Sequence, residues 1–143
     1  MIFLDSDAIM AFLKGKPNMA AFFAAHTKAI FALPIIVLYE VYYGLYFPPL
    51  SKRFQKDISF LNLLKKEEER ILQLLNDIPV FNVTFPVIKK SADISALLDA
   101  KGLKVGKIDV LIAGTILANG YRDLLTNNVT HYENIPSLKI HTF

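Results

Sequence analysis

Cysteine is absent from the sequence, and charged residues are sparse. Without cysteine the chain can form neither disulfides nor thiolate metal sites, so any metal must bind through oxygen or histidine, and an intracellular, cytoplasmic location is the simplest expectation. Charged residues make up 20% of the chain and hydrophobic residues 53%. This composition excludes a disordered polypeptide and predicts a folded one.

The sequence also lacks repeats, low-complexity tracts and linkers rich in Pro, Gly or Ser. We therefore interpret residues 1–143 as a single domain, which is long enough to bury roughly 68 to 70% of the surface of its unfolded chain. The net charge of +3 is too small for the dense basic surface of a nucleic-acid coat protein. Most lysine clusters are expected to be ordinary solvated faces.

Neither a secretory signal nor a membrane span is expected. Asp5 and Asp7 interrupt the first apolar stretch, and no positive region precedes it. The apolar run 30–50 is long enough to cross a bilayer, but a span would place Glu40 in the hydrocarbon layer. A buried strand that leads into a buried helix explains this run better.

Hydrophobic patterning predicts alternating strands and helices. Strands are expected at 1–4, 28–33, 79–85, 123–128 and 138–143, and helices at 8–13, 19–25, from Pro34 to about Gly44, at 53–76 as one helix or two, at 86–102 and at 109–120. Such alternation is typical of an α/β domain with a mostly parallel central sheet.

Several acids fall where strands or helices of this kind begin or end. Asp5 follows the first strand, Asp109 opens a helix after a glycine-containing loop, and Glu40 lies in an apolar helix with no neighbouring cation. Each has a purely structural interpretation, as a helix cap, a first-turn acid or a buried group with an unseen partner. Asn127 and Asn128 follow the fourth strand and fit a turn equally well.

Taken together, these residues favour a metal site over separate structural roles. Ligands of open parallel sheets bind at the carboxyl ends of the strands, where these acids are expected. Two carboxylates 4 Å apart repel by about 4 kcal/mol at an effective dielectric near 20. A hard divalent cation such as Mg²⁺ or Mn²⁺ would relieve that repulsion.

Four motifs resemble, in order and in context, those of the PIN-domain ribonucleases and especially the VapC toxins of toxin–antitoxin pairs. They are FLDSDAIMAFL, IVLYEVYYG, KIDVLIAGTILANG and LLTNNVTHYENIPSLKI, and the similarity covers essentially the whole chain. The resemblance implies a three-layer α/β/α sandwich with acids gathered at the carboxyl edge of its central sheet.

By that resemblance, Asp5, Glu40 and Asp109 correspond to the three metal-binding acids. Asn128 stands at the position of a fourth acid and brings no charge, which leaves one or two metal ions open. Asp7 stands where the family commonly has Asn and is expected to make an outer contact. Thr126 and Ser6 resemble the small hydroxyl residues that border the site.

The implied reaction is hydrolysis of RNA by a metal-activated water, without a covalent intermediate, to leave 3′-hydroxyl and 5′-phosphate ends. Lys104, Lys107 and the Lys52–Arg53 pair are candidates for holding the RNA backbone. The resemblance further implies a cognate antitoxin as partner and a homodimer. The tyrosines between Tyr39 and Tyr46 are expected in the core and a dimer surface, and His131 is interpreted as a surface or turn residue.

Two alternatives compete with this hypothesis. The IFLDSD opening also fits a haloacid-dehalogenase-type phosphatase, with Asp5 as nucleophile and Asp7 as general acid, and LLTNN resembles its threonine motif. Only 17 residues follow Thr126, however, with Glu133 as the sole acid, which is too little for the rest of that site. The second alternative is an inactive PIN-like binding module, which the uncharged Asn128 favours.

Overall fold

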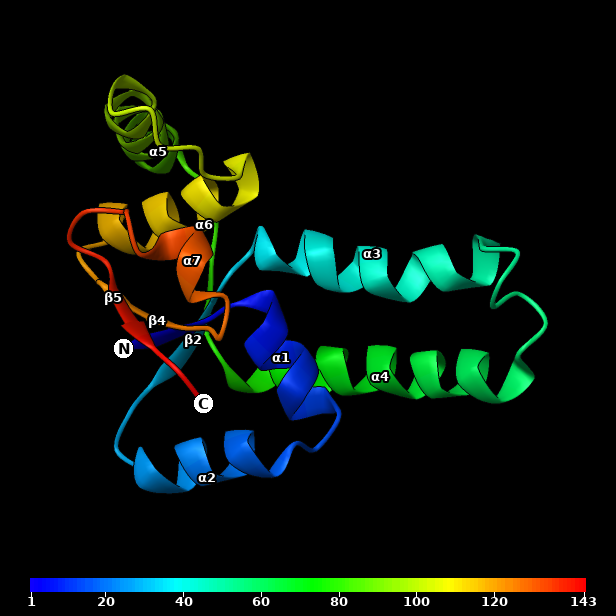
Figure 1. The fold of residues 1–143 in the computed structure, drawn as a ribbon. Helices are drawn as coiled ribbons and strands as arrows, with labels where there is room; N and C mark the ends of the chain where they lie inside the picture. Colours follow the sequence, from blue (N-terminus) through cyan, green and yellow to red (C-terminus); the bar gives the residue numbers. More distant parts are fainter.

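A five-stranded sheet with helices on both faces forms the core of the protein, as a computed structural model describes it for residues 1–143 (Figure 1). The strands are β1 (Ile2–Leu4), β2 (Phe31–Pro34), β3 (Val80–Phe81), β4 (Asp123–Leu125) and β5 (Lys139–His141). Their order across the sheet is β3-β2-β1-β4-β5, and every neighbouring pair is parallel. The predicted α/β fold with a parallel central sheet is confirmed.

Seven helices surround the sheet. They are α1 (Ser6–Leu13), α2 (Pro17–Ala25), α3 (Val37–Leu50), α4 (Ile58–Asp77), α5 (Phe85–Ala100), α6 (Lys107–Ala118) and α7 (Val129–Tyr132). Helices α5, α6 and α7 cover one face, and α1 and α2 cover the other (Figure 1). Helices α3 and α4 pack as an antiparallel pair that extends well beyond the sheet.

The core forms around the central strand. All three residues of β1 are buried, and the ring of Phe3 contacts those of Phe81 and Tyr121 at centroid distances of 5.0 and 5.5 Å. Helix α6 packs closely on α5 because Gly114 has no side chain: a Cβ there would lie 2.0 Å from the Ser91 hydroxyl oxygen. The sheet and α6 thus form a rigid base for the loops at the carboxyl edge.

The prediction that Pro34 opens a helix is wrong. Pro34 ends β2, and the hydrogen bonds to the β3 side come from the N–H groups of Leu33 and Ile35, so the proline between them needs none. Helix α3 starts three residues later and runs past Gly44 to Leu50.

Other boundaries also differ from the expectation. The segment 53–76 contains one helix, α4, which starts at Ile58 because Asp57 caps it through the N–H of Phe60. Strand β3 is shorter than the predicted 79–85, since Thr84 already begins α5 as its N-cap. The short helix α7 was not predicted. None of the helices combines the length and apolarity that crossing a bilayer requires.

Candidate active site

Asp5 lies at the carboxyl end of β1 and is only 2% exposed. Its Oδ1 accepts a hydrogen bond from the N–H of Ser6 at 2.8 Å, which caps α1. Its Oδ2 accepts one from the hydroxyl of Thr126, at the end of the neighbouring β4, at 2.9 Å. The predicted cap is therefore confirmed, and it uses the same carboxylate that is predicted to bind metal.

The hydrogen bonds to the Asp5 carboxylate do not fully compensate for the loss of its hydration. Desolvation raises its pKa from 3.8 to about 6, although the hydrogen bonds from Ser6, Thr126 and Tyr132 pull in the other direction. The nearby charge of Asp7 adds to the increase. A cation beside Asp5 would restore its ordinary acidity.

Asp109 is the third residue of α6, and its side chain is 16% exposed. Its Oδ1 accepts a hydrogen bond from the Tyr132 hydroxyl at 3.3 Å, and its Oδ2 lies 3.4 Å from Nδ1 of His131. The carboxylate folds back over the start of its helix, where a Cβ on Gly106 would come within 2.5 Å of Oδ2. Glycine at the N-cap of α6 is therefore what gives Asp109 its position.

Tyr132 connects the predicted acids. It is 1% exposed, and its hydroxyl interacts with both Asp5 and Asp109. Burial raises its pKa, and the negative charges of Asp5, Asp109 and Glu40 raise it further. Since all three charges act on this one hydroxyl, the acids converge on one region and do not lie on opposite sides of the molecule.

Glu40 is the least engaged of the three acids. It lies in the first turn of α3, is half-buried, and makes no hydrogen bond within the protein. It reaches Tyr132 through its charge and not through a contact. No three Asp, Glu or His side chains form a ready-made metal site, and of the three acids only Asp5 and Asp109 have side-chain hydrogen-bond partners.

The loop after β4 closes the region on one side. The N–H of Asn128 donates to the Thr126 hydroxyl at 3.0 Å, and the N–H of Asn127 donates to Oδ2 of Asp7 at 2.8 Å. Asp7 therefore anchors this loop, while its Oδ1 is buried without a hydrogen-bond partner. The side chain of Asn128 is exposed and free to approach a ligand.

These donors suit a hard divalent cation in their chemistry. The region offers carboxylate oxygens and an amide oxygen and no sulfur, as Mg²⁺ and Mn²⁺ prefer. The raised pKa of Asp5 shows a buried charge that its hydrogen bonds do not fully compensate, and Oδ1 of Asp7 is a buried acceptor without a partner. The residues present therefore fit a cation, with Asp5, Glu40 and Asp109 as the nearest charged donors.

Comparison with protein families identifies the fold. The model of the PIN domain matches residues 2–133, which is nearly the whole chain. The chain belongs to the PIN domain family. No curated protein sequence shows significant similarity to this PIN domain. The family match also decides against the phosphatase alternative.

Solved structures show the same fold. A chain of VapBC2 from Rickettsia felis, bound to a DNA fragment from its promoter, superposes with a TM-score of 0.78 at 22% identity and covers 100% of this chain and 99% of its own. A chain of VapBC from Salmonella typhimurium, also bound to DNA, superposes with a TM-score of 0.76 at 23% identity. The match covers 99% of this chain and 98% of the Salmonella chain. A chain of FitAcB from Neisseria gonorrhoeae superposes with a TM-score of 0.70 at 22% identity, and the match covers 100% of this chain and 96% of the FitAcB chain. The TM-scores show a shared architecture.

Two neighbouring residues of this PIN domain escaped the sequence analysis. His131, interpreted as a surface or turn residue, is 54% exposed yet lies against Asp109, and Tyr132 was not assigned any role. Both lie in α7, which is too short for a hydrophobic period to reveal. The available signals were their place in the motif LLTNNVTHYENIPSLKI and their position four and five residues after Asn127, in the segment that follows a parallel strand.

The candidate RNA-binding lysines fall in two different places. Lys107 is the first residue of α6, two positions before Asp109, and Lys104 lies in the exposed loop before it. Lys52 and Arg53 lie beyond the end of α3, and roughly 15 Å of helix separates that end from Glu40. In Figure 1 this turn is the far tip of the α3–α4 pair. Only the first group borders the acids.

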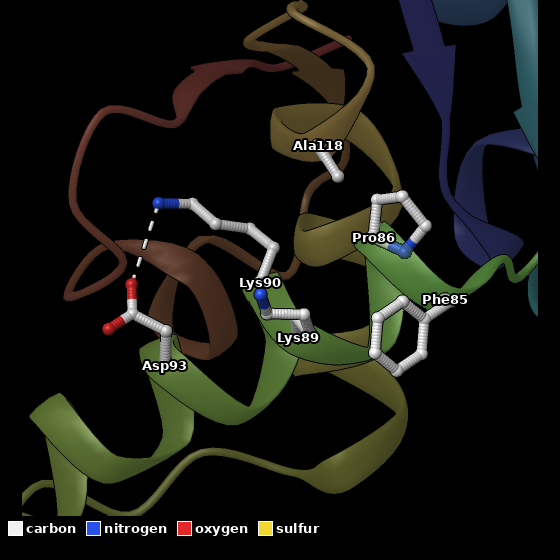
Figure 2. Close-up of a pocket in the computed structure, with 6 residues that line it drawn as sticks. All are labelled: Phe85, Pro86, Lys89, Lys90, Asp93 and Ala118. Atoms are coloured by element: carbon white, nitrogen blue, oxygen red, sulfur yellow. Dashed lines mark ion pairs between the residues drawn. The ribbon is translucent and has the colours of Figure 1, made fainter.

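A separate pocket of about 580 Å³ lies between the start of α5 and the end of α6 (Figure 2). Its lining consists of Phe85, Pro86, Lys89, Lys90, Asp93 and Ala118, and Lys90 pairs with Asp93 at 3.6 Å. Ala118 lies nine residues after Asp109, roughly 13 Å along α6. The hollow is therefore distinct from the acidic region.

Proposed function

We propose that this PIN domain is a metal-dependent endoribonuclease. The observation that carries the proposal is the meeting of Asp5 and Asp109 at the Tyr132 hydroxyl, at the carboxyl edge of a parallel sheet. PIN-domain nucleases generally use divalent metal ions, and the donors gathered here are all oxygen atoms. The raised pKa of Asp5 supports the same conclusion, since a cation would stabilise its charged form.

Asp5, Glu40 and Asp109 would hold Mg²⁺ or Mn²⁺. When bound, such an ion lowers the pKa of a water molecule and stabilises charge that develops on the phosphate. Thr126 and the N–H of Ser6 fix the Asp5 carboxylate. Asn128 would offer its amide oxygen to the ion or to a water, and because it is neutral we propose a single strong metal site.

The RNA strand would approach from the start of α6. Lys107 and Lys104 are exposed there, close to Asp109, and a positive charge at this position neutralises backbone phosphates. Binding that depends on such contacts weakens as salt concentration rises.

We further propose that the protein is a VapC-type toxin with a cognate antitoxin. The chains that share its fold over nearly their full length come from toxin–antitoxin complexes such as VapBC and FitAB.

A homodimer is proposed as well, because large apolar side chains of α3 and α5 are exposed, among them Tyr39, Tyr43, Phe47 and Phe85. Of the four tyrosines expected in the core and a dimer surface, Tyr42 packs against the core and Tyr39, Tyr43 and Tyr46 are exposed, so the dimer surface stays a prediction.

An inactive PIN-like module is the second candidate. Two observations favour it: the fourth position of the site is the neutral Asn128, and the three acids do not form a ready-made ligand set. Such a module would bind its partner through the same fold without cleaving RNA.

Cleavage of RNA with Mn²⁺, without added metal and with EDTA tests the proposal directly. The variant Asp109→Asn removes one candidate ligand, and Asp99→Asn, at an exposed position of α5, is the matched control. We expect cleavage by the wild type and by Asp99→Asn with Mn²⁺, and none by Asp109→Asn or with EDTA. Activity that survives both the substitution and EDTA would refute the mechanism.

Metal-dependent stability separates the enzyme from the inactive module. Binding of Mn²⁺ to the folded state alone raises the unfolding temperature, and the increase grows with the logarithm of the Mn²⁺ concentration above the dissociation constant. A higher unfolding temperature with Mn²⁺ in the wild type, abolished by Asp109→Asn, supports the enzyme. An unfolding temperature of the wild type that Mn²⁺ does not change favours the inactive module.

Light scattering determines whether the protein is a dimer. Growth arrest on expression, relieved by the product of a neighbouring gene, tests the toxin assignment.

A further inference from the structure

The hydroxyl group of Tyr132 has a position that packing alone does not explain. The ring fills a fully buried space in the core, and a phenylalanine would fill that space equally well. The additional oxygen reaches Oδ1 of Asp109 at 3.3 Å and also acts on Asp5. A buried tyrosine hydroxyl requires a polar partner, and here the hydrogen-bond partner, Asp109, is a candidate metal ligand, as is Asp5, whose charge acts on the same hydroxyl.

One donor between two carboxylates fixes their relative position. A phenol has a single proton to donate, whereas Asp5 and Asp109 are both acceptors when ionised. Without a donor between them, like charges in a buried region would turn apart. The hydroxyl therefore favours the arrangement in which both carboxylates face a common point.

The segment that carries Tyr132 supplies donors to both acids. Thr126, at the end of β4, donates to Asp5, and Tyr132, at the end of α7, donates to Asp109. The N–H of Asn128 in turn donates to the Thr126 hydroxyl, which ties the segment together. Residues 126–132 thus support the acids from one side, as outer residues do around a metal ion.

We propose that Tyr132 is a positioning residue that sets the orientation of Asp5 and Asp109 for a divalent cation. The inference rests on the proposed function, because it assigns the role of Tyr132 at the same site. Oδ1 of Asp109 retains a second lone pair while it accepts from the hydroxyl, and Oδ2 has its own. The hydrogen bond therefore orients the carboxylate without consuming its capacity to bind metal.

Calorimetric titration of Mn²⁺ into wild type, Tyr132→Phe and Tyr121→Phe tests the role. Tyr121 is a matched control, since it is half-buried against Phe3 and its hydroxyl has no hydrogen-bond partner in the protein. We expect the dissociation constant for Mn²⁺ to increase about tenfold in Tyr132→Phe, as for other outer residues, and to stay unchanged in Tyr121→Phe. Cleavage by Tyr132→Phe should recover at saturating Mn²⁺, with the KM for RNA unchanged.

Other outcomes would overturn the inference. Equal or tighter Mn²⁺ binding by Tyr132→Phe would do so and would leave the proposed function intact, provided that the wild type binds Mn²⁺ and cleaves RNA. A wild type that binds no Mn²⁺ would refute both. A loss of affinity shared by Tyr121→Phe would show a merely structural effect.

Discussion

The Thr126 hydroxyl donates a 2.9 Å hydrogen bond to Oδ2 of Asp5, across 121 positions of sequence. Both groups are buried, and the bond joins the ends of the two central strands, β1 and β4. The acid and the loop that closes the site are therefore held by one contact.

Replacing Thr126 by valine should destabilise the protein. Valine keeps the shape of threonine but leaves Oδ2 of Asp5 and the N–H of Asn128 without their partner, at a cost of about 1–3 kcal/mol for each buried group left unsatisfied. Denaturant unfolding of Thr126→Val measures the loss. Thr126→Ser, which keeps the hydroxyl, should lose only about 0.8 kcal/mol for the missing methyl group. Equal losses in both variants would contradict the assigned role of the hydroxyl.

The pKa of Asp5 predicts how stability depends on pH in the absence of metal. The folded protein holds the Asp5 proton up to a pH of about 6, whereas the unfolded chain releases it near 3.8. Between these values the folded state binds more protons, so the contribution of Asp5 to the free energy of unfolding falls as pH rises, by about 3 kcal/mol in total.

Asp5→Asn removes this titration and retains an oxygen that caps α1. At pH 7 the metal-free variant should be more stable than the wild type, although inactive, and the difference should shrink towards pH 4. Thermal unfolding in EDTA at a series of pH values tests this, and an unchanged pH profile would argue against a raised pKa.

Gly114→Ala should destabilise the contact between α5 and α6. The new methyl group would collide with the side chain of Ser91 and approach its Cα to 3.2 Å, and overpacking of this kind costs about 1–3 kcal/mol. Gly44→Ala is the control, because nothing lies within 4 Å of a Cβ at Gly44 and alanine favours a helix by roughly 0.5–1 kcal/mol. Denaturant unfolding should show a lower free energy of unfolding for Gly114→Ala and a higher one for Gly44→Ala. Adding Ser91→Gly to Gly114→Ala should restore part of the loss.

Gly106→Ser should reduce activity and leave stability almost unchanged. Serine is a good N-cap for α6, but its Cβ would displace the Asp109 carboxylate, whose Oδ2 lies 2.5 Å from that point. A displacement near 1 Å costs roughly 100-fold in rate at a catalytic site. RNA cleavage and thermal unfolding, measured together, test the prediction. Full activity would show that the position of Asp109 is not critical.

Sequence reasoning worked where positions follow from topology and failed where they depend on the path of a loop. Asp5 and Asp109 were expected near each other because the ends of parallel strands and the starts of the following helices share one edge, and both contact the same segment, residues 126–132. Tyr132 and His131 were missed because their contacts with Asp109 depend on how residues 126–132 turn, which no periodicity encodes. Pro34 was misplaced because a strand tolerates a proline only where no hydrogen bond needs its missing N–H. In β2 the N–H groups of Leu33 and Ile35 make the hydrogen bonds to the β3 side, which the sequence pattern does not reveal.

Glu40 was predicted as a ligand on the same terms as Asp5, but the structure holds the two side chains differently. Asp5 is fixed by two hydrogen bonds, whereas Glu40 has none and lies at the start of the projecting α3. A helix that leaves the sheet at its own angle sets the distance of Glu40 from the other acids, and that angle follows from packing against α1 and α4.

The sheet ends in very short strands, two residues in β3 and three in β5. Such edges expose little unpaired backbone, so a second polypeptide has almost no template on which to add a strand. Strand addition at either edge is therefore disfavoured, and the proposed homodimer would form through helices. The exposed rings along α3 supply an apolar surface for that contact.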